Sequence, residues 1–388
     1  MTSSTADAFG TFDFGLSAEQ ERRAAALHTE SVIVDLLYWG PVTYRSYTDE
    51  MSKRIEDAAA GMRDDYGVLR YSEELPGRMA VAREFDEFKQ AWDDSGITAG
   101  HFPFRVGSWE VMARSGAYLD LLLDGLPWLR KATTAGDIRA AKAAGEHAFF
   151  LQCQPSTPLS RDLDLIERGY DFGLRMLMLT YNNHDHIGAG CTDASNAGLS
   201  SLGIQLVHRL NDLGVIVDTA HCGKQTTLDA CRISRTPVVA SHTTAEGVHL
   251  HDRGKSDDEL RAIADTGGVI GIVTVPFFLG AGPDVTIEAM LDHIDYVASL
   301  VGWQHVAIGT DWPLGGPKWV MEELGRWALK QGFRAEHQID AVQNLVGFDD
   351  YRDFPNITRG LVKRGYSDEQ IKGLLGENAL RVFEAVCG

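Results

Sequence analysis

Apolar runs rich in β-branched residues recur along the chain, and segments with helical spacing separate most of them. Runs of this kind are typical of buried strands. They cover residues 31–39, 97–102, 147–154, 173–181, 215–218, 237–242, 267–275 and 304–312. Eight parallel strands with helices between them predict an α/β fold of the closed (β/α)8 type, a TIM barrel. A doubly wound sheet is disfavoured because no GxGxxG follows the first strand.

Two of the helical segments carry clear end signals. Ser17 is the predicted N-cap of a helix that runs to Glu30, and Thr134 and Gly145 bracket another helix. Residues 42–96 and 108–146 are mostly helical in pattern, so we expect an elaborated region at about 42–146. Because the chain has no internal repeat, low-complexity tract or Pro/Ser-rich linker, we expect one domain over residues 1–388.

Composition narrows the range of partners. A formal charge of −19 and a pI near 5.0 disfavour nucleic acid and anionic membranes. The start of the chain lacks a signal-peptide pattern, and no apolar run reaches the roughly 18 residues of a membrane span, so we expect a cytoplasmic protein. The five cysteines are scattered without a CxxC pair, which argues against a disulfide framework or a thiolate zinc site. Cys222 is a candidate nucleophile, although burial as a small hydrophobe is the commoner role.

Three side chains at strand ends form the first candidate site. His221 follows the fifth predicted strand, His242 ends the sixth and Asp311 ends the eighth. The carboxyl ends of barrel strands share one rim, so these side chains are expected to converge. Two imidazoles and a carboxylate suit a divalent zinc, iron, cobalt or manganese ion. Capping of strand and turn ends is the structural alternative for each residue.

Several motifs together resemble the renal (membrane) dipeptidase family of the amidohydrolase superfamily over nearly the whole chain. They are ALHTESVIVD, GDIRAAKAAG, GLRMLMLTY, GLSSLGIQLVHRLNDLGVIVDTAH, PVVASHTTA, GGVIGI, VAIGTDW and RGYSDEQIKGLLGENALRVF. The resemblance implies a metal-binding (β/α)8 barrel, dipeptide hydrolysis at a two-metal centre, and a homodimer. By position, His221 and His242 match two ligands of one metal. Asp311 matches a ligand of the other metal that also moves a proton, and Arg253 matches the arginine that grips the substrate carboxylate.

The sequence departs from the family pattern at four positions. The H-x-D motif of the first strand is replaced by Leu37 and Trp39, the bridging glutamate by Gln154, and a substrate-binding histidine by Tyr181. Leucine and tryptophan do not ligate such cations, and glutamine is a poor substitute for a bridging carboxylate. We therefore expect at most one divalent ion, held by His221, His242 and Asp311.

Further candidates lie near the same rim. His184 and His186 follow the fourth strand and could add ligands or act as general acid and base, with a solvated polar loop as the alternative. Tyr38, Trp39 and Tyr181 would form an aromatic wall beside Gln154 and contact substrate, although core packing is the alternative for Trp39.

These residues predict a metal-dependent, amidohydrolase-like enzyme with a mononuclear centre. Its substrate would be a small carboxylate-bearing molecule held by Arg253, with hydrolysis of an amide or related bond and weak or no turnover of ordinary dipeptides. A non-hydrolytic metalloenzyme, such as an oxygenase, decarboxylase or lyase, is one alternative. A catalytically silent binding protein is the other.

Overall fold

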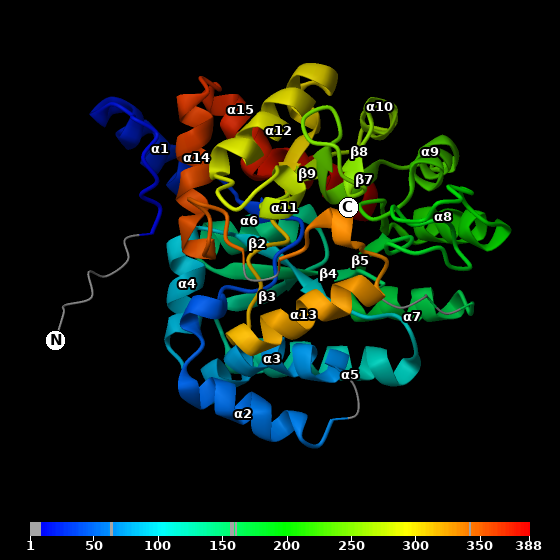
Figure 1. Ribbon diagram of the computed structural model, residues 1–388, viewed down its shortest axis with the longest axis horizontal. Helices are drawn as coiled ribbons and strands as arrows, with labels where there is room; N and C mark the ends of the chain where they lie inside the picture. The colour runs from blue at the N-terminus through cyan, green and yellow to red at the C-terminus, as the bar shows by residue number, and fades with distance from the viewer. Residues whose placement is uncertain (1–8, 63–64, 156–158, 160, 341–342) are drawn as a thin grey trace.

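The computed structural model describes residues 9–62, 65–155, 159, 161–340 and 343–388. Its centre is a closed barrel of eight parallel strands (Figure 1). In order around the barrel they are β1 (Val34–Asp35), β2 (Ala99–Pro103), β4 (His147–Cys153), β5 (Leu174–Met178), β6 (Ile216–Asp218), β7 (Val238–Ala245), β9 (Ile270–Ile272) and β10 (Val306–Ile308). Pairing of β2 with β4 and of β1 with β10 closes the ring. Each strand overlaps one of the eight apolar runs, so the predicted TIM barrel is confirmed.

Two short strands extend the sheet outside this ring. β3 (Leu129–Ala132) pairs with β4, and β8 (Gly254–Lys255) pairs with β7. The prediction of a helical pattern throughout residues 108–146 is wrong at β3. Only the two end residues of β3 are buried. The sequence LRKA therefore lacks the apolar run that marks the other strands.

Helices surround the barrel. They are α1 (Ala18–Glu30), α2 (Asp49–Ala59), α3 (Asp65–Val81), α4 (Glu87–Ser95), α5 (Trp109–Gly125), α6 (Ala135–Ala144), α7 (Asp164–Phe172), α8 (Ser201–Leu213), α9 (Lys224–Ile233), α10 (Asp257–Asp265), α11 (Pro276–Leu279), α12 (Ile287–Val301), α13 (Lys318–Lys330), α14 (Phe354–Lys363), α15 (Asp368–Lys372) and α16 (Asn378–Cys387). The predicted caps are confirmed: Ser17 accepts a hydrogen bond from the Gln20 backbone N–H, and Thr134 accepts one from that of Asp137. Gly145 ends α6 in the left-handed conformation with a φ of 68°.

Helices from distant parts of the sequence meet beside the barrel. Figure 1 shows α2, α3 and α13 lying together at one end of the molecule. Their contact is a small apolar cluster made of Met51, Ile55, Leu75, Met79, Val320 and Met321. The helices predicted for residues 42–96 therefore form an outer layer that reaches across to α13.

Close packing and buried carboxyls fix the strands inside the barrel. A Cβ atom on Gly309 would lie 1.9 Å from the Ser241 carbonyl oxygen, so β7 and β10 approach closely only because residue 309 is glycine. Asp35 accepts a hydrogen bond of 2.6 Å from the Thr310 hydroxyl. Burial raises the pKa of Asp35 to about 7, which shows how apolar the surroundings of this carboxyl are.

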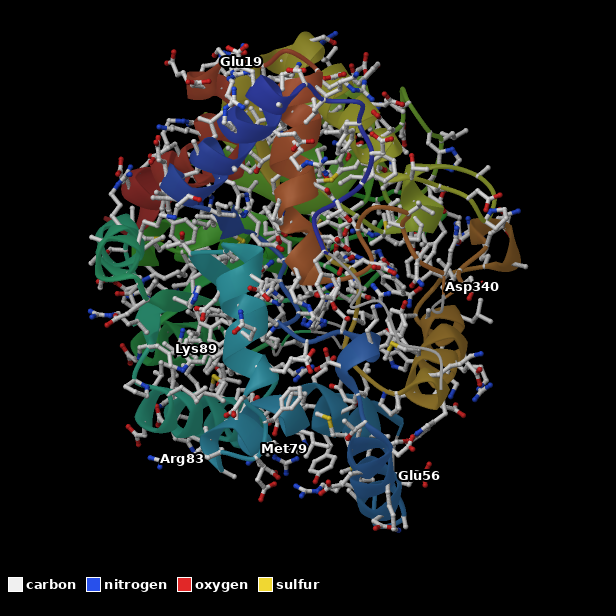
Figure 2. The ribbon with its side chains drawn as sticks, turned by 90° about the vertical axis from the view of Figure 1, so that its left-hand side faces the viewer. Glu19, Glu56, Met79, Arg83, Lys89 and Asp340 are labelled. Carbon is white, nitrogen blue, oxygen red and sulfur yellow. The ribbon has the colours of Figure 1, made fainter. Side chains whose placement is uncertain are left out.

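The outer helices are polar on their exposed faces. Figure 2 shows Glu19, Glu56 and Lys89 at the surface of α1, α2 and α4. Within the described ranges, no helix has both the length and the apolar composition needed to cross a bilayer.

Candidate active site

A recess of about 960 Å³, counted with its open mouth, lies at the carboxyl ends of the barrel strands. The strand ends and the segments that follow them supply Trp39, Pro103, Arg105, Gln154, Tyr181, His221, Val275, Phe277, Phe278, Asp311 and Trp312. The outer layer adds Leu69, Glu73, Leu314, Leu324, Trp327, Ala328, Phe333 and Ile339. Most of the wall is apolar or aromatic, and a few polar groups lie among these residues. This is the composition of a small-molecule site.

Asp311 lies three residues beyond the end of β10 at the recess. Its φ of 57° is in the left-handed region, which a side chain other than glycine rarely adopts. Its backbone N–H donates to the Leu37 carbonyl at 2.9 Å, and its Oδ1 accepts from the indole N–H of Trp39 at 2.9 Å. Burial raises the pKa of Asp311 to about 6, although the Trp39 hydrogen bond acts against this rise. The carboxyl can therefore exchange a proton near neutral pH.

His221 is held by hydrogen bonds at both ring nitrogens. Its Nδ1 lies 2.6 Å from Asn182 Oδ1, which can only accept, so the proton is on Nδ1. Its Nε2 is then an acceptor, and the side-chain N–H of Gln154 donates to it at 3.1 Å. Tyr181 stacks on the ring with centroids 4.2 Å apart. Burial lowers the pKa of His221 well below its usual range, so the ring is neutral.

His242 lies next to His221, with ring centroids 4.9 Å apart. Ser241 donates its hydroxyl proton to Asp218 at 2.5 Å and accepts from His242 Nδ1 at 2.7 Å. The remaining His242 nitrogen, Nε2, is a buried acceptor with no hydrogen-bond partner among the described residues. His242 is not part of the recess wall itself and lies within β7, beneath it.

His101 joins this group although the sequence analysis did not single it out. It lies in β2, and its Nδ1 accepts from the Tyr38 backbone N–H at 2.6 Å, which leaves the ring proton on Nε2. Its ring meets that of Trp39 edge to face at 5.3 Å. Burial lowers the pKa of His101 to about 3. The signal was available, because His101 stands near the end of a predicted strand as His242 does.

Arg253 contacts the backbone rather than the recess. It is 1% exposed, and its guanidinium donates to the Ala220 carbonyl at 2.6 Å and to the His242 carbonyl at 3.0 Å. Arg253 is not among the residues that line the recess, so its contact with a substrate carboxylate stays a prediction. Its two hydrogen bonds instead link the turn that precedes His221 to β7.

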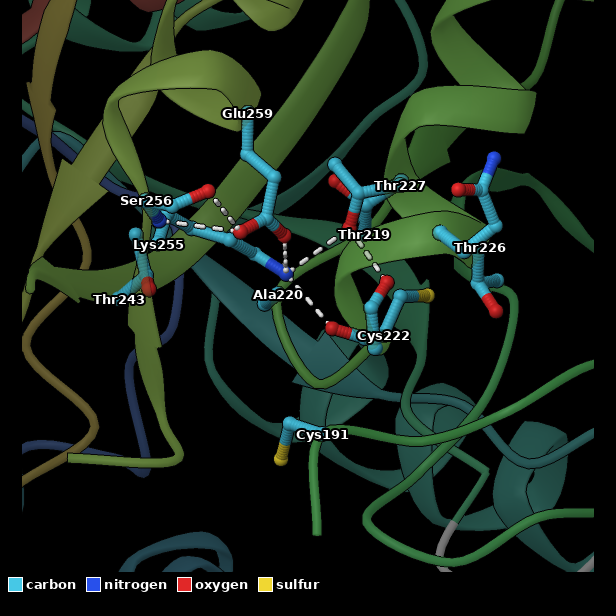
Figure 3. Close-up of polar contacts among 12 residues, drawn as sticks. Cys191, Thr219, Ala220, Cys222, Thr226, Thr227, Thr243, Lys255, Ser256 and Glu259 are labelled. Atoms are coloured by element: carbon cyan, nitrogen blue, oxygen red, sulfur yellow. Dashed lines mark hydrogen bonds and ion pairs between the residues drawn. The ribbon is translucent and has the colours of Figure 1, made fainter. Parts of the chain in front are cut away.

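Lys255 holds the other side of the same turn (Figure 3). Its ammonium donates to the Cys222 carbonyl at 2.7 Å and to the Thr227 hydroxyl at 2.9 Å, and it lies 3.2 Å from Glu259. Ala220 and Cys222 flank His221, so one buried cation binds the backbone before this histidine and another binds the backbone after it.

Other predicted site residues lie away from the recess. Tyr38 is fully buried and packs edge to face against Trp92 and Tyr351, with centroids 4.7 Å and 4.6 Å away. It is thus a core residue and not part of the aromatic wall. Neither His184 nor His186 lines the recess. The intervening Asp185 accepts from the Ile187 backbone N–H at 2.8 Å, which turns this loop locally.

The cysteines are free thiols in the structure. All five are free, so the expectation of no disulfide framework holds for each of them. Cys222 is 1% exposed and accepts a hydrogen bond from Thr180 at 3.3 Å. Burial raises the pKa of its thiol to about 11, which makes it a poor nucleophile at neutral pH.

The closed barrel with its recess at the strand ends has the architecture of barrel hydrolases. An amidohydrolase from Pseudomonas aeruginosa has this fold, with a TM-score of 0.73 and 25% identity over 94% of this chain and 99% of its own. The model of the membrane dipeptidase family, peptidase family M19, matches residues 118–327 and 338–387. The chain belongs to this family.

Two further comparisons found similar proteins. Dipeptidase verJ of Clonostachys rogersoniana is 28% identical over 262 residues, which are 66% of this chain and 59% of that protein. The match thus covers less than two thirds of the length of these curated relatives. A solved family M19 metallopeptidase, dipeptidase AC, is 20% identical over 76% of this chain and 88% of its own, with a TM-score of 0.65.

The residues present do not fit the metal centre that the family implies. In the described part of the chain, no three His, Cys, Asp or Glu side chains are placed to hold one ion. The expected ligand set of His221, His242 and Asp311 is therefore not assembled as one group. Trp39 donates to the carboxylate of Asp311, and Gln154 donates to the free nitrogen of His221.

Proposed function

We propose that this protein hydrolyses an amide or related bond in a small molecule that carries an apolar or aromatic body and a carboxylate, with Asp311 as the proton-transferring group. The position of Asp311 supports this proposal most. A carboxyl with a pKa of about 6, in the wall of a largely apolar recess, has the properties of a general acid and base.

Asp311 would act at both stages of the reaction. Its carboxylate takes a proton from a water molecule as the water oxygen adds to the substrate carbonyl carbon. It then gives that proton to the leaving nitrogen as the carbon–nitrogen bond breaks. Because Trp39 holds Oδ1, we assign proton transfer to Oδ2.

The recess wall supports the substrate class. Trp39, Tyr181, Phe277, Trp312 and Trp327 would surround an aromatic or apolar group, and small polar dipeptides would fill this space poorly.

Arg105 takes the role that the sequence analysis gave to Arg253. Among the described residues that line the recess, Arg105 is the one cation. It lies 3.8 Å from Glu73, and burial raises the pKa of Glu73 to about 7. A substrate carboxylate could replace this long contact with a bidentate one. Homodimerisation stays a prediction from the family resemblance.

A substrate panel with one variant tests the proposal. N-acyl amino acids and dipeptides with aromatic side chains should be hydrolysed faster than alanyl dipeptides, and free acids faster than their carboxamides. Asp311→Asn should lower kcat for the preferred compound by about 10²–10⁴-fold, the usual contribution of a general acid and base. Glu56→Gln, on the exposed surface of α2 (Figure 2), serves as the control and should leave the rate unchanged.

The other outcomes discriminate the alternatives. Turnover that Asp311→Asn leaves intact would refute the role of this carboxyl. Product formation by loss of carbon dioxide or by elimination would favour the lyase alternative. Saturable binding without any product would favour the silent binding protein.

A further inference from the structure

We infer that hydrogen-bond donors have replaced the metal ions at this site, so that Trp39 serves the Asp311 carboxyl and Gln154 serves the His221 imidazole in a centre that binds no divalent cation. The inference concerns the same recess as the proposed function. It is tested by metal content, so either statement can fail without the other.

The first replacement is the contact between Trp39 and Asp311. Trp39 stands where the family resemblance puts the aspartate of H-x-D, and Asp311 is a retained ligand position. Residues 39 and 311 are far apart in sequence, yet the indole N–H lies 2.9 Å from Asp311 Oδ1. The substituted residue therefore offers a proton to the very carboxylate that a cation would otherwise hold.

The second replacement is the contact between Gln154 and His221. Gln154 stands at the bridging-glutamate position, and His221 is again a retained ligand position. The Gln154 N–H meets the lone pair of His221 Nε2 at 3.1 Å, and Asn182 fixes the proton on the other ring nitrogen. That lone pair is the one a metal would need, because a neutral imidazole ligates through its unprotonated nitrogen.

Too few metal-ligating atoms remain to hold an ion. His242 Nε2 is without a partner in the described chain, and Trp39 holds only one of the two Asp311 oxygens, but one imidazole and one carboxylate oxygen fall short of the three protein ligands that zinc sites usually have. Leu37, at the histidine position of H-x-D, is fully buried, and its side chain has no atom that could ligate a metal.

The two contacts supply what a metal ion would otherwise supply to the same side chains. A metal ion gives a carboxylate a positive neighbour and fixes the orientation of an imidazole. An N–H donor has both effects without adding a full positive charge to the site. A site without a metal ion also needs no further carboxylates to balance the charge of that ion. Two independent substitutions each became a donor aimed at a retained ligand, which is the pattern expected when the ligands keep their places after the ions are lost.

Metal retention decides the matter. The full chain, purified without chelator, is equilibrated with ZnCl2, MnCl2 or CoCl2, freed of excess ion by gel filtration and analysed by mass spectrometry. We expect less than about 0.1 equivalent of each metal, and a thermal midpoint that the ions do not raise, because a ligand that does not bind the folded state cannot stabilise it. About one equivalent or more, lost in His221→Ala, would overturn the inference.

A gain-of-binding variant provides the matched comparison. Leu37→His/Trp39→Asp/Gln154→Glu restores the three ligand types that the family resemblance places there, and should retain at least one equivalent of zinc. Trp39→Asp/Gln154→Glu keeps the apolar Leu37 in case the triple variant does not fold, and should also bind more zinc than the parent. Folded double and triple variants that bind no more zinc than the parent would contradict the account.

Discussion

The two sides of the recess are held in different ways. On the side of β6 and β7, His221 and His242 keep their family positions, and the buried cations Arg253 and Lys255 bind the backbone around them. On the side of β1 and β4, Trp39 and Gln154 replace ligands and donate to groups across the recess. The retained side is thus held by hydrogen bonds from buried cations to its backbone, and the altered side is held by side-chain hydrogen bonds across the recess. Loss of the ligands on one side need not disturb the other.

The largest expected effect comes from the bracing lysine on the retained side. Lys255→Met would leave the carboxylate of Glu259 buried without its cation, and Lys255 and Glu259 are 1% and 3% exposed. Removal of one partner of such a pair costs about 3–5 kcal/mol of unfolding free energy. Urea unfolding measures this loss. Lys255→Met/Glu259→Gln should recover part of it, because the glutamine oxygen can still accept from Ser256.

An exposed ion pair gives the control for this measurement. Lys224 pairs with Asp258 at the surface, with side chains 44% and 74% exposed, so Lys224→Met should cost less than about 1 kcal/mol. If Lys255→Met costs no more than Lys224→Met, the retained side is not braced by its buried lysine.

The next effect tests the donor on the altered side. The folded-state pKa of Asp311 is about 6, above the usual 3.8, so unfolding releases a proton between these values and stability falls as pH rises through this window. At about pH 8 the ionised carboxylate accepts a charge-assisted bond, and Trp39→Phe should cost about 2 kcal/mol. At about pH 5 the carboxyl is protonated, and the same substitution should cost about 1 kcal/mol. Urea unfolding at both pH values gives the difference.

A second tryptophan controls for the loss of an indole N–H. Trp319 donates to the neutral hydroxyl of Ser52 at 3.0 Å, away from the recess. Trp319→Phe should therefore cost the same at both pH values. A pH-independent cost for Trp39→Phe would show that its N–H does not serve an ionised carboxylate.

The smallest effect concerns His101, which lies beside Trp39. Burial chiefly, with the charge of Arg105, lowers the pKa of His101 from 6.5 to about 3. The unfolded chain therefore binds a proton that the folded protein does not bind, and stability is lost as the pH falls below the pKa of His101 in the unfolded chain. Between about pH 7 and pH 5.5 this histidine accounts for a loss of about 1 kcal/mol.

A variant isolates the share of His101 from that of the other histidines. In His101→Asn the side-chain oxygen can still accept from the Tyr38 N–H, but nothing titrates. The fall in unfolding free energy over this pH interval should then be about 1 kcal/mol smaller than in the parent. Equal falls in the two proteins would mean that the pKa of His101 is the same in the folded and the unfolded protein.

Local patterns predicted the scaffold well. The apolar runs gave all eight barrel strands, and capping residues such as Thr134 and Gly145 located helix ends. β3 was not predicted because two exposed, charged residues fill the middle of this four-residue strand. The exclusion of a disulfide framework was right because cysteine spacing is a property of the sequence itself.

Side-chain roles at the site were harder to predict than their positions. Placement after a strand brought Trp39, Gln154, Tyr181, His221 and Asp311 to one recess. The same rule did not predict that Tyr38 packs in the core or that the Arg253 guanidinium donates to a backbone carbonyl. It also did not predict that Asp185 accepts a backbone hydrogen bond within the loop that carries His184. Side chains of adjacent residues near a strand end point in different directions, so one residue decides between the recess and the core.

The sequence by itself determined the barrel, the family and the identity of the substituted ligand positions, because these depend on periodicity and spacing along the chain. Only the tertiary structure decided that Trp39 meets Asp311 and that Gln154 meets His221. Those contacts join residues separated by 272 and 67 positions. They arise because the barrel closes and brings the ends of β1, β4, β6 and β10 to one rim, and no local pattern carries that information.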